Sequence, residues 1–153
     1  MKYALVVKED CETCQLVVPV IAQIAESAEL MIYCQDNAAF PEGFAVEDDT
    51  DLAFSWRHRI ETVPTLICLD VEGNETDRTF GWDRAAWQTL TGLDLHQDIP
   101  DFRPGCGSKS QDPGMPEKLA ARYDLELLKA RQVVLAEQED VMEACYDRGW
   151  SDG

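Results

Sequence analysis

A Cys-x-x-Cys motif lies between two apolar segments of different periodicity, and this junction limits what the chain can fold into. Residues 3–7 form a short, continuous apolar run, which predicts a buried β-strand. Residues 16–25 repeat apolar side chains three and four positions apart, which predicts a helix. Cys11 therefore lies close to a helix N-terminus, where unpaired backbone N–H groups and the helix dipole favour a thiolate.

The remaining pattern up to residue 95 predicts a compact α/β core. We expect a helix over 13–27, a buried strand over 29–34 and a loop over 37–50. A helix from about 50 to 59 follows, capped by Asp49 or Thr50, and then strands over 62–69 and 75–80 and a helix capped by Asp83. A helix joins the first two strands, so they should be parallel, whereas the last two should form an antiparallel hairpin. The prediction is a mixed four-stranded sheet flanked by helices.

Composition divides the chain into three parts. Residues 1–95 should be the core, and residues 96–116, rich in Pro and Gly, an irregular linker. Residues 117–153 should be a helical extension with an apolar stripe that includes Leu119, Tyr123 and Cys145. A helix of about 30 residues spans about 45 Å. It must bend, break or reach another subunit, and we expect a homodimer through this helix.

The net charge of −17 restricts the classes of partner. Nucleic acid and anionic membranes would be repelled unless the chain carried a local basic patch, and none stands out. No apolar run approaches the length of a membrane span. Glu9 and Asp10 follow the first apolar run, where a signal peptide would need small neutral residues. We expect a cytoplasmic protein without nucleic-acid or membrane partners.

Four landmarks give residues 1–95 a resemblance to the thioredoxin-fold oxidoreductases. The Cys-x-x-Cys motif follows the first strand, and Pro19 lies five residues beyond Cys14. Val63-Pro64-Thr65 is similar to the family's cis-proline segment, and Gly81 follows the predicted hairpin. The resemblance implies a thioredoxin-like fold and thiol–disulfide exchange without a cofactor.

The resemblance also implies roles for these residues. A cis bond before Pro64 would leave the Val63 backbone free to pair with a bound peptide, so Val63, Pro64 and Gly81 are the predicted substrate-binding residues. Cys11 is the expected nucleophile and Cys14 the resolving thiol. The expected partners are a protein or small-molecule disulfide and a thiol reductant or reductase.

Several residues depart from the family pattern. Asp10 and Glu12-Thr13 replace the usual Trp and Gly-Pro around the first cysteine, and Leu5 replaces the family's buried acid. We expect the carboxylates of Glu9, Asp10 and Glu12 to disfavour a nearby thiolate. The sequence therefore predicts a slow or specialised exchanger.

Four further cysteines lie outside the motif. Cys34 and Cys68 fall within apolar strands and should be core residues. Cys106 lies between two glycines and close to Arg103 and Lys109, so it is either a reactive auxiliary thiol or a loop cysteine without a role. Cys145 falls on the predicted extension, and the sequence does not place it near Cys106.

Two other functions remain open. The Cys-x-x-Cys could carry a thiophilic metal ion between its thiolates, or the core could be an interaction module that docks a partner through the extension. The chain has two histidines and no second Cys-x-x-Cys, so we expect no closed metal site.

Overall fold

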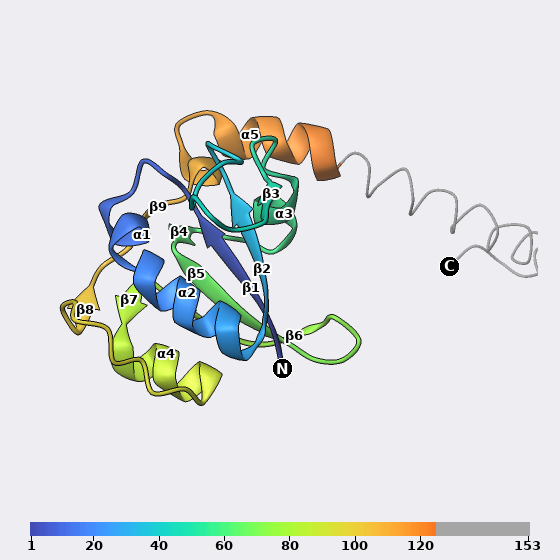
Figure 1. Cartoon of the computed structure of the whole chain (residues 1–153). Coiled ribbons are helices and arrows are strands. Elements are labelled where there is room, and N and C mark those ends of the chain that lie inside the picture. Colours follow the sequence, from blue (N-terminus) through green and yellow to red (C-terminus); the bar gives the residue numbers. More distant parts are fainter. Residues whose placement is uncertain (125–153) are drawn as a thin grey trace, which may run out of the picture. The chain divides into compact units, whose positions relative to one another are not determined.

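The computed structural model describes residues 1–124 of the chain (Figure 1). The elements follow in the order β1 (Lys2–Val7), α1 (Glu12–Leu16), α2 (Val18–Ser27), β2 (Glu29–Cys34), β3 (Val46–Asp48), α3 (Ala53–Arg57), β4 (Thr62–Val63), β5 (Thr65–Leu69), β6 (Glu75–Phe80), β7 (Trp82–Asp83), α4 (Arg84–Thr91), β8 (Phe102–Arg103), β9 (Cys106–Gly107), the short 3₁₀ helix η1 (Lys109–Gln111), α5 (Met115–Leu119) and the π-helical turn η2 (Ala120–Asp124).

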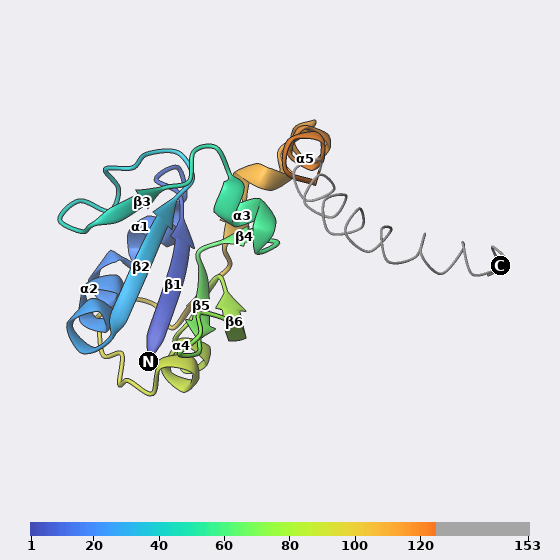
Figure 2. The ribbon, with the colours of Figure 1, turned by 90° about the vertical axis from the view of Figure 1, so that its right-hand side faces the viewer.

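A mixed five-stranded sheet forms the centre, with the strand order β3-β2-β1-β5-β6 (Figure 2). β2 is parallel to both β1 and β3, and β5 is antiparallel to both β1 and β6. Residues 3–7 of the central strand β1 are all buried, as the continuous apolar run predicts. β1 ends at Val7, so the Cys-x-x-Cys motif begins just beyond the end of the central strand, at Cys11.

The prediction of four strands was wrong by one strand. β3 lies within the expected loop and pairs Val46 with Ile32 at the edge of the sheet. Only one residue of β3 is apolar, and its two carboxylates, Glu47 and Asp48, are exposed. A short, charged edge strand carries no alternating apolar pattern, so periodicity cannot reveal it.

The helix expected over 13–27 is divided into α1 and α2. The division falls at Val17, and Pro19 lies in the first turn of α2, where a proline loses no helical hydrogen bond. α1, α2 and α4 lie on one side of the sheet and α3 lies on the other (Figures 1 and 2). Gln23 of α2 donates a hydrogen bond to the carbonyl of Asp94, just beyond α4, over 2.6 Å, which links α2 to the segment after α4 on the same side of the sheet.

Two carboxylates act at helix N-termini, as expected. The Asp83 side chain accepts a hydrogen bond from the Ala86 N–H and caps α4. The buried Asp49 carboxylate accepts from the N–H groups of Phe54 and Ser55, so it caps α3 from outside the helix. α3 itself begins after Leu52, which has a left-handed backbone with φ of 61°, and is shorter than predicted.

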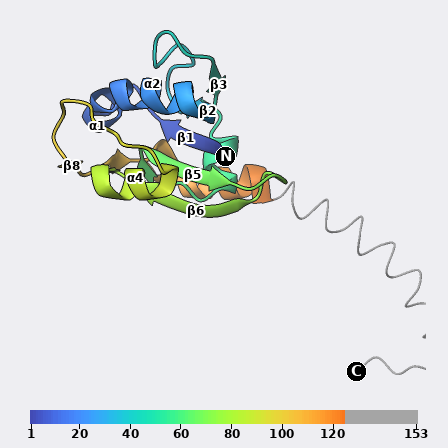
Figure 3. The same ribbon diagram turned by 60° about the horizontal axis from the view of Figure 1, so that its bottom comes forward.

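The segment 96–116 differs from the irregular linker that we expected. It runs past α1 (Figure 3) and forms two short ladders with the core, β8 with β7 and β9 with β4. The Arg84 guanidinium donates hydrogen bonds to the carbonyls of Leu95, Gln97 and Ile99 and pairs with Asp101. These contacts include the segment in the first of two compact units, Met1–Pro116 and Glu117–Gly153.

Residues 117–124, the described start of the second unit, are helical in the end of α5 and in η2. The rest of the predicted extension, including Cys145, lies outside the described residues, so the long helix and the homodimer stay predictions. Of the helices in residues 1–124, none combines the length and the apolar character needed to cross a bilayer.

We predict that Arg84→Met lowers the free energy of unfolding by about 1–3 kcal/mol, because several partly buried carbonyls lose their donor. Urea denaturation measures this, with Arg57→Met as the control on an exposed arginine. Equal losses in both variants would contradict the role assigned to Arg84.

Candidate functional site: three thiols at the N-terminus of a helix

Three cysteines from two distant parts of the chain meet beside the N-terminus of α1. Cys11 is the N-cap residue of α1, Cys14 lies in its first turn, and Cys106 belongs to β9. The Sγ atoms of Cys11 and Cys106 lie 2.8 Å apart. Cys11 is 4% exposed and Cys14 is fully buried, whereas Cys106 is only partly buried. The structure thus places Cys106, which the sequence left as either an auxiliary thiol or a loop cysteine without a role, beside the predicted pair.

Strand pairing brings Cys106 to this place. β9 runs antiparallel to β4, with Cys106 opposite Val63 and Gly107 opposite Thr62. The Val63 carbonyl lies 3.8 Å from the Cys11 sulfur. The peptide bond between Val63 and Pro64 is cis, as the resemblance implies. The bond between Phe40 and Pro41 is also cis, which was not predicted. Three of the predicted site residues, Cys11, Cys14 and Val63, therefore lie together.

Gly81 and Pro64 complete the predicted set. The Gly81 N–H donates a hydrogen bond to the Pro64 carbonyl over 2.8 Å. Gly81 has a φ of 69°, and a Cβ there would lie 3.1 Å from the backbone nitrogen of Gly105. Gly81 therefore touches the segment that leads into Cys106, and glycine allows the two backbones to approach closely.

Hydrogen bonds to sulfur favour the Cys11 thiolate. The Cys14 thiol makes the largest contribution, and with the Cys106 thiol and the N–H groups of Cys14 and Thr13 it lowers the pKa of Cys11 to about 5, although burial opposes the shift. The Cys14 N–H lies 3.3 Å from the Cys11 sulfur, the geometry of a helix N-cap. Cys11 is therefore the thiolate of the cluster near neutral pH.

The other two thiols stay protonated beside it. Burial, followed by the hydrogen bond to Cys11 and the negative charge of that residue, raises the pKa of Cys14 strongly. The same causes raise the pKa of Cys106, while the Thr13 N–H and the Lys8 ammonium oppose the shift. One thiolate thus has two neutral thiols as its donors.

The net shift of the Cys11 pKa is downward, opposite to the direction expected from the nearby carboxylates, because the donors outweigh any opposing effect. Glu12 is exposed and forms an ion pair with Arg103, so part of its charge is compensated. Arg103 also donates to the Thr13 hydroxyl over 3.1 Å, and Lys8 donates to the Gly107 carbonyl over 2.8 Å. The sequence places Arg103 far from Glu12, so this pairing could not be anticipated.

Asp36 positions the loop before Cys11, and the sequence reasoning missed it. The Asp36 carboxylate accepts hydrogen bonds from the N–H groups of Glu9 and Asp10 over 2.7 and 3.0 Å. Burial opposes ionisation of Asp36, but these donors and the Cys34 thiol lower its pKa. One signal was available, because the ends of the parallel strands β1 and β2 meet at the same edge of the sheet.

The remaining cysteines of the core stay apart from the cluster. Cys34 and Cys68 are buried, as predicted, and burial raises the pKa of Cys34. Within residues 1–124, no three His, Cys, Asp or Glu side chains are arranged to hold a metal ion.

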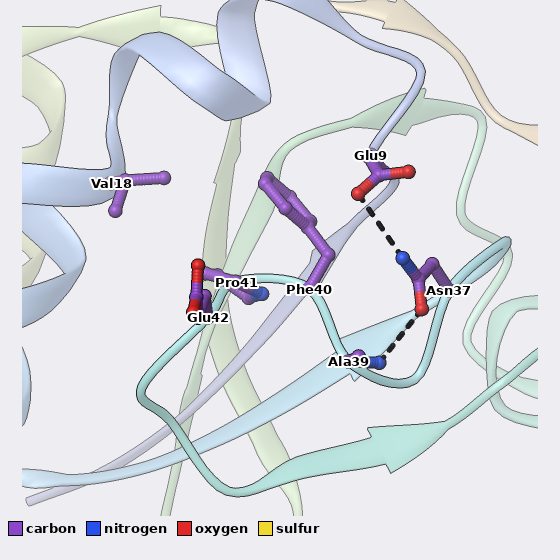
Figure 4. A pocket seen from close by; sticks show the side chains of 7 residues that line it. All are labelled: Glu9, Val18, Asn37, Ala39, Phe40, Pro41 and Glu42. Atoms are coloured by element: carbon purple, nitrogen blue, oxygen red, sulfur yellow. Dashed lines mark hydrogen bonds between the residues drawn. The ribbon is translucent and has the colours of Figure 1, made fainter.

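A surface pocket lies beside the motif (Figure 4). Phe40 projects from the β2–β3 loop toward the helix that carries Val18, and Asn37 donates a hydrogen bond to Glu9 over 3.1 Å. The lining residues are Glu9, Val18, Asn37, Ala39, Phe40, Pro41 and Glu42. None of these is a thiol, so the pocket supplies no reactive group to exchange chemistry.

We predict that Cys14→Ala raises the pKa of Cys11 from about 5 toward the ordinary thiol value, because the strongest donor to the thiolate is lost. The thiolate absorbance followed against pH measures the midpoint, and Cys68→Ala is the control for a buried cysteine elsewhere. The folded pKa lies below the unfolded value of about 8.5, so wild-type stability should rise with pH between the two. An unchanged midpoint in Cys14→Ala would contradict this electrostatic account.

No protein-family model and no curated protein matches the chain. Among solved structures, the chain is similar to a crystal structure of a hypothetical protein, SMc02350, from Sinorhizobium meliloti 1021. The TM-score is 0.45 and the identity 16%, over 69% of this chain and 76% of that one. A likeness of this size says nothing about activity, so the function has to come from the geometry of the three thiols.

Proposed function

We propose that the protein is a thioredoxin-like thiol–disulfide oxidoreductase in which Cys11 is the nucleophile and Cys14 its partner in the motif. The observation that supports this most is the placement of Cys11 at the N-terminus of α1, with its pKa lowered to about 5 by donors from Cys14, Cys106 and the backbone. Exchange requires a thiolate, and this arrangement supplies one near neutral pH.

The arrangement of the elements supports the thioredoxin-like part of the proposal. The helices α1 and α2, which carry the motif, connect the parallel strands β1 and β2. The antiparallel β5–β6 hairpin leads through Gly81 to α4. Val63 lies beside the Cys11 sulfur, and Pro64 accepts a hydrogen bond from Gly81. All three residues are buried and β9 already pairs with Val63, so they would be substrate contacts where a substrate displaces β9.

The chemistry begins when the Cys11 thiolate attacks one sulfur of a substrate disulfide. A new bond forms between Cys11 and that sulfur, the substrate S–S bond breaks, and the second substrate sulfur leaves as a thiolate. A second protein thiol then attacks the Cys11 sulfur and releases the bound substrate half as a thiolate. The protein dithiol loses two electrons and the substrate disulfide gains them.

A thiol reductant would return the protein to its dithiol form. Low-molecular-weight thiols or a reductase would serve, and a cytoplasmic location fits this need because thiols are kept reduced there. The partner is therefore a disulfide on one side of the cycle and a thiol on the other.

We predict that Cys11→Ser abolishes exchange with oxidised glutathione, because a hydroxyl supplies no thiolate. The assay mixes prereduced protein with oxidised glutathione and measures the reduced glutathione that is released. Cys68→Ser is the matched control, since Cys68 is buried in β5 away from the cluster. Exchange by Cys11→Ser at the wild-type rate would refute the proposal.

A further inference from the structure

The edge of β4 is already occupied by the chain itself. β9 pairs with both residues of β4, with Cys106 opposite Val63. The resemblance to thioredoxins assigns this edge to a substrate strand that would bring a sulfur to Cys11. The sulfur that lies there is that of Cys106, 2.8 Å from the Cys11 sulfur.

Glycine makes this close fit achievable. A Cβ added at Gly105 would lie 2.4 Å from the Thr62 Cγ2 and 2.6 Å from the Val63 carbonyl oxygen. The second distance is to backbone and cannot be relieved by a side-chain rotation. Gly105 therefore allows the segment to lie directly on β4, whereas a Cβ at Gly107 would meet nothing within 4 Å.

Side chains hold the segment on both sides of Cys106. On the N-terminal side, the Thr13 hydroxyl donates to the Pro104 carbonyl over 2.7 Å. On the C-terminal side, the buried Gln35 donates to the Ser108 hydroxyl over 2.7 Å and accepts from the Lys109 N–H over 2.9 Å. Cys106 is thus held in place by hydrogen bonds on both sides of it in the chain.

We propose that Cys106 is the thiol that resolves a mixed disulfide on Cys11, closing a Cys11–Cys106 disulfide on the strand that takes the place of a substrate. This inference rests on the proposed function, because it needs Cys11 to react first. It departs from the prediction that Cys14 resolves the intermediate.

The step balances with a low-molecular-weight disulfide as the oxidant. The Cys11 thiolate attacks oxidised glutathione, bonds to one glutathione sulfur and releases the other as a thiolate. Cys106 gives its proton to solvent or to that released thiolate and attacks the Cys11 sulfur. The bond between Cys11 and glutathione breaks, the second glutathione leaves as a thiolate, and the protein has lost two electrons.

The resolving thiol must release its proton, and Cys106 can do this more readily than Cys14. Cys14 has no exposed surface, and the fully buried Leu5 occupies the place of the acid that the resemblance assigns as a proton acceptor. Cys106 is only partly buried, so its proton can reach solvent or the released thiolate. Burial and the bond to Cys11 raise the pKa values of both thiols, and Lys8 opposes both shifts, through its backbone at Cys14 and through its charge at Cys106.

Disulfide mapping separates the two resolving thiols. Prereduced wild type, Cys14→Ala, Cys106→Ser and the double variant are mixed with oxidised glutathione, quenched with acid and digested for mass spectrometry. Wild type and Cys14→Ala should give a Cys11–Cys106 peptide pair. Cys106→Ser should release the second glutathione more slowly by at least about tenfold, because a positioned internal thiol is lost.

The double variant distinguishes failure of this inference from failure of the proposed function. It should hold glutathione on Cys11, since neither neighbouring thiol remains. No adduct in the double variant would refute the proposed function and with it this inference. An adduct there, with Cys106→Ser resolving at the wild-type rate through a Cys11–Cys14 pair, would refute the inference alone.

Gly105→Ala tests the strand placement without altering any thiol. It should reduce the yield of the Cys11–Cys106 pair, because the added Cβ forces the segment away from the Val63 carbonyl. Gly107→Ala is the matched control and should leave the yield unchanged. Equal yields in the two variants would contradict delivery of Cys106 by this strand.

Discussion

Backbone pairing between β4 and β9 is the interaction on which the site depends. The ladder is only two residues long, yet it places Cys106 opposite Val63 and beside the Cys11 sulfur. Without it, Cys11 would have one neighbouring thiol and an open strand edge. With it, the Cys11 thiolate at the N-terminus of α1 has two thiol donors, Cys14 and Cys106, that stabilise its negative charge. The fold and the chemistry therefore meet at one short ladder.

A two-residue ladder is weak alone, so the surrounding polar contacts matter. The buried side chain of Gln35 joins Ser55 of α3 to Ser108, and the Ser110 hydroxyl donates to the Ile60 carbonyl. If the segment moved away, these buried donors and acceptors would lose their hydrogen-bond partners, which would lower the stability of the fold. At the other end, Thr13 of α1 holds the Pro104 carbonyl. The helix that carries the Cys-x-x-Cys motif thus also holds the segment that leads into Cys106.

Local pattern predicted most of the sheet and two of the three thiols in the cluster. The apolar run of β1, the hairpin after Asp70 and the cap at Asp83 are decided by neighbouring residues, so they could be found from sequence. The position of Cys106 depends on hydrogen bonds to residues about 70–95 positions away, and a Pro- and Gly-rich segment gives no periodicity to reveal them. For the same reason the Glu12–Arg103 pair escaped prediction.

Redox titration of Cys14→Ala in glutathione buffers tests the central claim most directly. Cys11 is the reactive thiol in this account, and a second partner remains when Cys14 is absent. The variant should therefore still titrate as a two-electron couple and end as an internal disulfide. A variant that ends instead as a stable mixed disulfide with one glutathione would contradict the account, because Cys106 would then lie beside Cys11 without reacting with it.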